Sequence, residues 1–354
     1  MNRFCTLAMI IFISSGIHSA AQTTQANDST TKKIAKYKPK ISGAVAMHYN
    51  AEFNTNGDSL VDPDGFRLFK ARLEANGKIS NKILYNIMID LRHPEPGGLL
   101  RDAYIDLLFI KNQTIRIGRQ KTQFGWENLE STTELYTVMR AEMSDAISRG
   151  WQLRDNGIGI LGHIPISKNI RFEDAITFTN GTRFDVTGPY DFNTKKALWG
   201  RLGIRFKKDD LIIKLGGSFG TGGFRYLGED AIDPADDLYV DFNRLGADVQ
   251  VDHKHFYLAA EYGWATDHVK DSIMEDPFTG YQVLLAIKTK WKVGPLGKYD
   301  VSTLDDWKVT TVGAYYGLPK DKFRILVNYV FRGQITDIPG GHDDRLYIQM
   351  QVVF

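Results

Sequence analysis

Two glycine-rich motifs in this sequence have the residue types of enzyme sites. GIGILG, with glycines at 157, 159 and 162, has the spacing of a dinucleotide-binding turn, but HIPISKN follows it and cannot open the required helix. GGSFG surrounds Ser218 like a nucleophile elbow, but it continues the strand-like stretch LIIKLGGSFG and lacks the strand–turn–helix context. We therefore predict neither a cofactor nor a catalytic residue.

Two acidic stretches could supply oxygen ligands to calcium: NTNGDSLVDPDG at 54–65 and GEDAIDPADD at 228–237. An EF-hand alignment that starts at Asn54 puts Ser59 at position six, where glycine is needed. The composition favours solvated loops, and calcium binding stays open. The sequence predicts no metal site, because metal-ligand spacing is absent among five of the histidines, namely His48, His93, His163, His255 and His268.

Lysine and arginine side chains are the remaining candidates, because they could attract small anions. Five lie on alternating segments: Arg72, Arg116, Lys288, Lys290 and Arg324. Four lie in or beside a long connection at 121–150: Lys121, Arg140, Arg149 and Arg154. Acidic residues lie among them, namely Glu74, Asp90, Asp102, Asp106, Glu127 and Glu130. The whole chain has 44 basic and 42 acidic residues, a balance that argues against nucleic-acid binding.

The first 21 residues have the features of a secretory signal peptide. A basic start, MNR, precedes the apolar run FCTLAMIIFI, and Ser19 and Ala21 occupy the −3 and −1 positions of a cleavage site before Gln22. The only cysteine, Cys5, lies in that run, so the mature chain has no disulfide. Residues 22–40 are polar and lysine-rich, and we expect a mobile periplasmic tail.

From residue 41 onward, apolar and polar residues alternate, which predicts strands with two different faces. FRILVNYVFR and HFYLAAEYGW carry aromatics at both ends of the apolar face, eight positions apart. Eight residues of strand span roughly 26 Å. Tilted in a barrel, such a strand matches the height of an outer-membrane apolar band with its aromatic girdles. No segment reaches the 18 apolar residues of a transmembrane helix.

The connections alternate between short polar turns and long loops, as in a transmembrane barrel with short periplasmic turns and long extracellular loops. Successive strands of a barrel must alternate in direction across the membrane. This alternation breaks between the expected strands 280–290 and 307–317 unless LGKYDVST forms a further strand between them. The count is then sixteen, which is even, as bacterial barrels require. The other expected strands are 41–52, 66–77, 83–92, 101–109, 114–120, 155–163, 170–179, 197–206, 211–219, 240–251, 255–264, 280–290, 307–317, 323–332 and 345–354.

The chain ends in RLYIQMQVVF, whose apolar residues have a strict period of two and finish on Phe354. Every backbone polar group must be paired in lipid, so the last strand must pair with the first. A terminal strand ending in an aromatic residue resembles the element presented to the barrel assembly machinery. We assign this role to Phe354, Val352 and Met350, and we expect outer-membrane lipid and that machinery as partners.

Several segments together resemble the phosphate-selective porin O and P family. They are FRLFKARLEANGKI, LRDAYIDLLF, IRIGRQKTQFGWENLES, RDNGIGILGHI, GPLGKYDVST and RLYIQMQVVF. The resemblance implies a sixteen-stranded, trimeric channel that passes anions, with an inward-folded loop and basic side chains lining the lumen. Because acidic residues lie among the basic candidates, the sequence predicts a weak anion preference, and a phosphate filter stays open.

The connection 121–150 has more apolar residues than water-exposed loops usually carry, including Phe124, Trp126 and Tyr136. We expect Thr132 or Thr133 to cap a short helix through ELYTVMRAEM. A segment of this length should pack onto something, and the lumen of a sixteen-stranded barrel is wide enough to hold it. We expect it to fold inward and narrow the pore. A lid over the rim or a contact with a neighbouring subunit is the alternative.

These observations predict an all-β protein of the outer membrane of Gram-negative bacteria, with a barrel over 41–354. The expected function is that of a porin, a water-filled channel for passive diffusion of small solutes and ions. Two alternatives stay open: a barrel enzyme of the lipase or protease type, and a non-conducting structural barrel. The length before residue 41 excludes a plugged TonB-dependent transporter.

Overall fold

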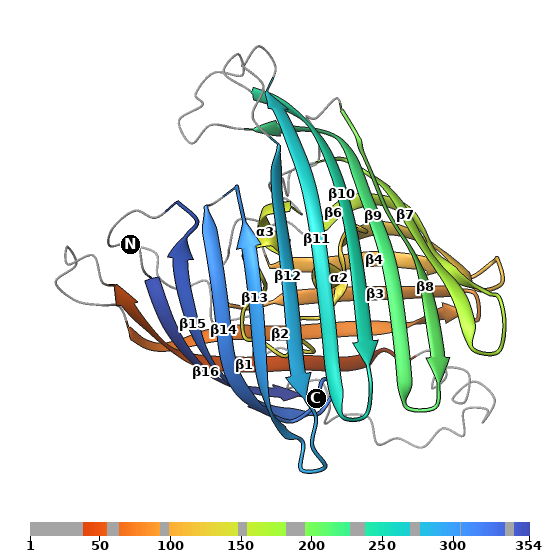
Figure 1. The fold of residues 1–354 in the computed structure, drawn as a ribbon. Helices are drawn as coiled ribbons and strands as arrows, with labels where there is room; N and C mark the ends of the chain where they lie inside the picture. Colours follow the sequence, from red (N-terminus) through yellow and green to blue (C-terminus); the bar gives the residue numbers. More distant parts are fainter. Residues whose placement is uncertain are drawn as a thin grey trace, which may run out of the picture. The chain divides into compact units, whose positions relative to one another are not determined.

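The computed structural model describes residues 38–54, 64–92, 99–147, 154–181, 195–226, 238–269, 277–304, 306–336 and 343–354. These residues form a closed antiparallel barrel in which each strand pairs with its sequence neighbours and β1 pairs with β16 (Figure 1). The predicted barrel of sixteen strands is therefore confirmed. The signal peptide, most of the tail at 22–40 and both acidic stretches proposed for calcium lie wholly or largely outside the described residues.

The strand bounds are β1 Lys40–Asn54, β2 Asp64–Ser80, β3 Ile83–Asp90, β4 Leu100–Leu107, β5 Gln113–Lys121, β6 Arg154–Pro165, β7 Ile170–Thr179, β8 Ala197–Lys208, β9 Leu211–Tyr226, β10 Leu238–Asp252, β11 Phe256–Val269, β12 Phe278–Ile287, β13 Val293–Ser302, β14 Trp307–Tyr316, β15 Phe323–Gln334 and β16 Asp343–Val353. Two short helices, α2 (Trp126–Leu129) and α3 (Glu142–Ile147), lie between β5 and β6. Among the described residues, no helix is long and apolar enough to cross a membrane.

The side chains are arranged inside out relative to a soluble protein. Along β16, Gln349 and Gln351 are buried, whereas Ile348, Met350 and Val352 are exposed. The same alternation recurs around the barrel, so large aliphatic and aromatic side chains form the outer surface and polar side chains fill the interior. Such a surface is stable in lipid, where the outer apolar residues need no burial in protein.

The barrel closes at the chain's last residue. The Gly43 amide donates to the Phe354 carbonyl at 2.9 Å, and the Phe354 amide donates to the Gly43 carbonyl at 3.0 Å. A Cβ at position 43 would lie 2.6 Å from the Phe354 ring, so glycine is needed for this close approach. The prediction that the last strand pairs with the first is confirmed.

The short turns contain residues in the left-handed region, which tight connections require. Asn112, Asp209 and Lys292 have φ values of 61°, 50° and 59°. The turn between β12 and β13 begins earlier than expected, because β12 ends at Ile287. The predicted strand at 280–290 was too long.

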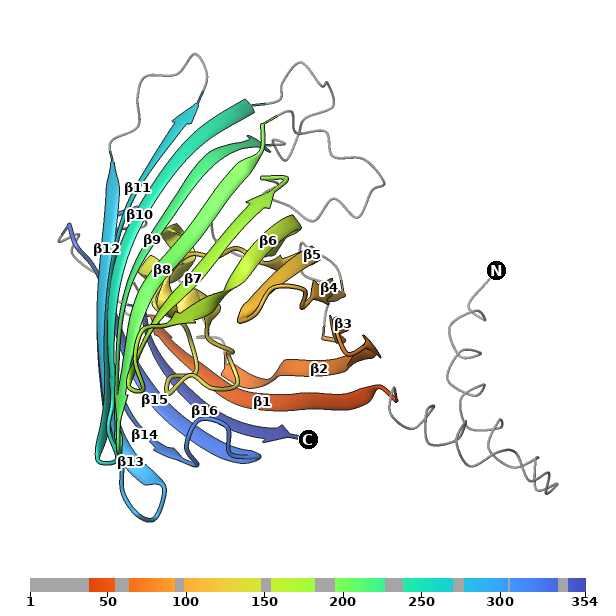
Figure 2. The same cartoon turned by 90° about the vertical axis from the view of Figure 1, so that its right-hand side faces the viewer.

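Two views place α2 and α3 within the ring of strands (Figures 1 and 2). The helix predicted through ELYTVMRAEM is wrong, because residues 130–141 are not helical and α3 begins only at Glu142. The carbonyls of Thr133 and Leu135 instead accept hydrogen bonds from Arg324 on β15. These contacts satisfy carbonyl groups that a helix would otherwise pair internally.

Candidate functional site

The candidate site is the barrel interior together with residues 122–147, called here the 122–147 segment. Carboxylates on the wall hold one side of this segment. Glu261 on β11 accepts hydrogen bonds from the amides of Trp126 at 2.9 Å and Glu127 at 3.3 Å. Asp300 on β13 accepts one from the Glu142 amide at 2.9 Å. These buried acceptors pair amides that would otherwise lack partners at the starts of α2 and α3.

Cations bind other parts of the segment by its carbonyl groups. Lys70 on β2 donates to the Thr132 carbonyl at 2.8 Å, and Lys121 donates to the carbonyls of residues 128, 129 and 130 at 2.9–3.0 Å. Arg324 on β15 donates to two further carbonyls. Arg140, within the segment, donates to the Glu127 and Glu130 carbonyls. A carbonyl accepts these hydrogen bonds but carries no formal charge, so the contacts do not neutralise the four side chains as carboxylates would.

The segment has further wall contacts that complete its path across the interior. The Val138 amide donates to Asn328 on β15 at 2.7 Å, and Gln282 on β12 donates to the Ser144 hydroxyl at 3.0 Å. Arg244 on β10 donates to the Ile147 carbonyl at 2.8 Å. The segment is therefore fixed by strands on opposite sides of the barrel.

Three other predicted cations form ion pairs with acidic residues on nearby strands. Arg116 contacts Asp106 at 2.7 Å, and Arg154 contacts Asp102 at 2.8 Å. Arg72 contacts Asp90 at 2.9 Å and also donates to the Thr132 hydroxyl. Each pair places opposite charges together, which greatly reduces its net field in the lumen.

The last three predicted cations are less central. Lys288 follows the end of β12 and pairs with Asp252. Lys290 lies in the exposed turn, with its ammonium 4.8 Å from the centre of the Trp291 ring. Its expected position on the barrel wall is therefore wrong, because the strand ends before it. Arg149 lies outside the described residues.

Sequence reasoning missed several wall residues that hold the segment: Lys70, Glu261, Asp300 and Asn328. All are buried polar side chains. The alternation of each strand could have assigned them to the interior face. Their partners could not be found in this way, because each contact joins residues far apart in the sequence.

Ser218, the serine of the GGSFG motif, lies on β9 and accepts a hydrogen bond from the Gly125 amide at 3.1 Å. It thus anchors the 122–147 segment. GIGILG forms part of β6. Within the described residues, no group of three histidine, cysteine or acidic side chains could hold a metal ion.

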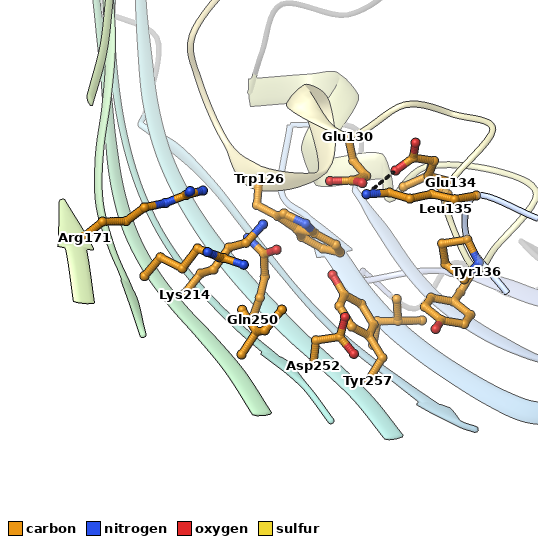
Figure 3. Close-up of a pocket in the computed structure, with 15 residues that line it drawn as sticks. Trp126, Glu130, Glu134, Leu135, Tyr136, Arg171, Lys214, Gln250, Asp252 and Tyr257 are labelled. Carbon is orange, nitrogen blue, oxygen red and sulfur yellow. Dashed lines mark ion pairs between the residues drawn. The ribbon is translucent and has the colours of Figure 1, made fainter. Parts of the chain in front are cut away.

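Two cavities adjoin the segment. One, of 250 Å³, lies against β2–β6 and is lined by basic side chains that include Lys70, Arg72, Lys121, Arg140 and Arg154. The other, of 340 Å³, lies near the short-turn ends of β7–β11, where wall residues face Trp126 and Tyr136 of the segment (Figure 3). Both provide space for small solutes beside the segment.

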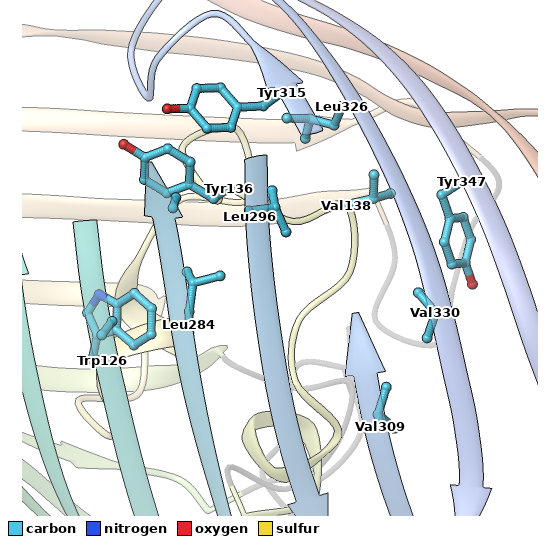
Figure 4. Close-up of a cluster of buried hydrophobic side chains, with 12 residues drawn as sticks. Trp126, Tyr136, Val138, Leu284, Leu296, Val309, Tyr315, Leu326, Val330 and Tyr347 are labelled. Carbon is cyan, nitrogen blue, oxygen red and sulfur yellow. The ribbon is translucent and has the colours of Figure 1, made fainter. Parts of the chain in front are cut away.

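An apolar cluster fixes the segment against β11–β16 (Figure 4). Tyr136 packs on Tyr315 with ring centres 5.1 Å apart, and Val138 is buried in the same cluster. Burying each such side chain stabilises by about 1.5–3 kcal/mol. The apolar residues that made 121–150 unusual in sequence are thus packed within the barrel.

The pH dependence of this packing should follow Asp145 in α3. Burial raises the pKa of Asp145 to about 7, with the Glu127 and Glu142 carboxylates adding to the rise and Arg140 opposing it. An unburied aspartate titrates near pH 4. Between about pH 4 and about pH 7 the packed segment therefore retains a proton that a released segment loses, so packing weakens as the pH rises through this window.

Hydrogen exchange of amides at 141–147, corrected for the intrinsic rate, should show less protection at about pH 8 than at about pH 5. Asp145→Asn should reduce the difference, because the amide does not titrate. The same loss of protection in the Asn variant would contradict the assignment to Asp145.

Comparison with known proteins gives a family match and a set of similar folds. Residues 41–167 match the phosphate-selective porin O and P family, which confirms the resemblance over that region. A search of curated protein sequences finds no match.

Among solved structures, an anion-selective porin from Comamonas acidovorans has 12% identity and a TM-score of 0.60, covering 90% of this chain and 100% of that chain. The outer membrane channel DcaP of Acinetobacter baumannii has 14% identity and a TM-score of 0.57, with 90% and 98% covered. OmpT of Vibrio cholerae, an outer membrane protein in trimer form, has 10% identity and a TM-score of 0.56, with 90% and 100% covered. At these identities the likeness concerns the fold.

Proposed function

This chain is a sixteen-stranded outer-membrane barrel with a match to the phosphate-selective porin O and P family, and from that premise we propose that it is a porin for small solutes with a weak preference for anions. The observation that carries the proposal is the closed barrel with an apolar outer surface and a charged interior. Charged side chains inside a membrane protein are costly unless they contact water or ions, so this interior favours a water-filled channel.

The proposed pore runs beside the 122–147 segment, which narrows it. Lys70, Lys121, Arg140 and Arg324 bind carbonyls, which carry no formal charge, so these four basic side chains would attract anions. Glu261 and Asp300 on the wall accept hydrogen bonds from backbone amides, and Asp300 also lies 3.9 Å from the Lys298 ammonium. Basic and acidic side chains in the same interior support a weak anion preference over a strict anion filter.

Reversal potentials in a potassium chloride gradient test this balance. We expect a reversal potential with the sign of anion selectivity and a magnitude well below the chloride equilibrium potential. The reason is that carboxylates offset part of the field of the basic side chains. A near-ideal anion preference with block by millimolar phosphate would contradict the weak preference. A cation preference would contradict the role of the carbonyl-bound cations.

A trimer in the outer membrane is the proposed assembled form. Support comes from the trimeric form of the structurally similar OmpT of Vibrio cholerae and from the family resemblance. The terminal strand, with Phe354, Val352 and Met350 facing outward, is the proposed contact for the barrel assembly machinery. Sedimentation of the detergent-solubilised protein tests the trimer.

One alternative has support in the structure. The 122–147 segment contacts strands on opposite sides of the interior, so a non-conducting barrel is the second candidate. Planar-bilayer recordings decide between the two, because only a porin gives discrete conductance steps. The enzyme alternative gains no such support, because Ser218 is engaged with the Gly125 amide.

A further inference from the structure

Three cations lie directly opposite one another on adjacent strands near the short-turn end of the barrel. Arg171 on β7 is in register with Arg205 on β8, and Arg205 is in register with Lys214 on β9. Side chains opposite each other in antiparallel strands have Cβ atoms about 4.5–5.5 Å apart, and like charges at this spacing are destabilising. The row thus weakens the sheet, and a bound anion would relieve the repulsion.

The structure provides little internal compensation for this row. Arg171 contacts Glu173 at 2.5 Å. On the next two strands, the positions in register with Glu173 are occupied by Gly203 on β8 and Gly216 on β9. Neither position therefore supplies a carboxylate to the row. Within the part of the chain that the structure describes, neither Arg205 nor Lys214 forms an ion pair with an acidic side chain. Two adjacent cations therefore remain available to a ligand.

Aromatic side chains form another wall of the same cavity, which has a volume of 340 Å³ (Figure 3). Tyr257 on β11 stacks on Tyr136 with ring centres 5.2 Å apart, and Trp126 lies 6.1 Å from Tyr257. Trp126 is only 4% exposed, and its indole Nε1 has no hydrogen-bond partner in the described structure. A buried donor without a partner is costly, so it is an independent sign of a missing acceptor.

Other charges around the cavity are mostly matched. Glu134 lies 4.0 Å from Lys320, and Asp252 pairs with Lys288. Burial and a hydrogen bond with Glu130 raise the pKa of Glu134. Glu134 and Asp252 therefore each have a basic neighbour other than Arg205 and Lys214.

We propose that this cavity is a binding subsite for a small anion that carries a ring, such as a sugar phosphate or an aromatic carboxylate. The anionic group binds Arg205 and Lys214, the ring packs on Trp126 and Tyr257, and an acceptor on the ligand receives the Trp126 indole N–H. The cavity lies at the lower end of the size range of ligand pockets, about 300–1,000 Å³. The subsite rests on the proposed porin function, because a ligand reaches it through the lumen.

Channel block in planar bilayers tests the ligand class with matched probes. We expect glucose 6-phosphate to block at about tenfold lower concentration than inorganic phosphate, while glucose does not block. Benzoate against acetate is the parallel pair for an aromatic carboxylate. If the ring-bearing anion of either pair blocks at a lower concentration than its ring-free partner, that pair identifies the kind of ring that binds. Equal block within both pairs would overturn the proposal, because the cavity would then respond to charge alone.

Substitutions locate the subsite. Arg205→Gln with Lys214→Gln should raise the half-blocking concentration of the ring-bearing probe about tenfold. Lys168→Gln with Lys208→Gln removes the same charge from exposed rim residues that do not line this cavity, and block should be unchanged. Trp126→Phe keeps a ring but removes the N–H, and it should weaken the ring-bearing probe while leaving inorganic phosphate unaffected. Heat-modifiable migration on a gel verifies that each barrel is assembled.

Two further outcomes separate this subsite from the porin function. If the ring-bearing probe blocks the Arg205→Gln, Lys214→Gln channel as strongly as the wild-type channel, the subsite proposal is overturned and the porin proposal stands. If the wild-type protein does not conduct, the porin proposal fails, and calorimetry of the detergent-solubilised barrel with the same probes still measures binding. Heat of binding lost in the double variant supports the subsite in that case, and equal heats overturn it.

Discussion

Removal of residues 127–145 is expected to raise single-channel conductance severalfold while the barrel still assembles. The deleted part occupies the interior and carries the contacts to Lys70, Arg324 and Asp300. Barrel strands pair with one another independently of it, and water in the widened lumen can solvate the released wall charges. A short glycine–serine linker should replace the segment so that β5 and β6 stay in register.

The matched control loosens the segment without removing it. Glu261→Ala takes away the acceptor for the Trp126 and Glu127 amides, so we expect noisier current with little gain in mean conductance. Unchanged conductance in a correctly assembled 127–145 deletion would place the segment outside the conducting path. Heat-modifiable migration must accompany the recordings, because an unassembled barrel also lacks conductance.

Deletion of Phe354, or Phe354→Asp, is expected to leave the protein unassembled in the periplasm. Deletion removes both hydrogen bonds that join the last residue to Gly43 at the closing seam. The deletion also removes an exposed aromatic ring that follows the C-terminal end of β16. Phe354→Asp keeps the backbone but places a charge at that lipid-facing position. After the deletion, the Gly43 N–H and C=O lose their partners at the seam, which costs several kcal/mol for each group in lipid.

Phe354→Tyr is the control, because it keeps the aromatic ring and the backbone contacts to Gly43. Its abundance as a heat-modifiable barrel should match that of the wild type. Full assembly of the Phe354 deletion would show that the seam closes without the terminal residue. Equal failure of Phe354→Tyr would instead mean that the position requires phenylalanine itself.

The strand pattern could be predicted from the sequence because each strand faces two different environments. Lipid on one side and the interior on the other require a period of two, as the outward Ile348, Met350 and Val352 of β16 illustrate. The additional strand at LGKYDVST was inferred from the required alternation of strand direction, and it corresponds to β13. Strand ends were less certain, since Lys290 continues the local pattern but lies in a turn.

The charge pairing could not be predicted, because it depends on contacts between strands. Arg154 and Asp102 are both inward-facing by pattern, yet only their positions in the folded barrel show that they neutralise each other. The row of Arg171, Arg205 and Lys214 likewise needs the register of three strands. An alternating sequence assigns a side chain to a face but does not give its neighbour across the sheet.

The conformation of the 122–147 segment also depended on tertiary contacts. ELYTVMRAEM has helix-forming residues, but Arg324 and Gln351 from the wall both donate to the carbonyl of Thr133, just before it, and Asn328 accepts from the Val138 amide. The sequence by itself determined a closed barrel with a lipid-facing surface, because backbone pairing and apolar exposure are properties of each strand. Only the tertiary structure decided which interior charges remain unpaired, because partners from distant strands compete for the same carbonyls and carboxylates.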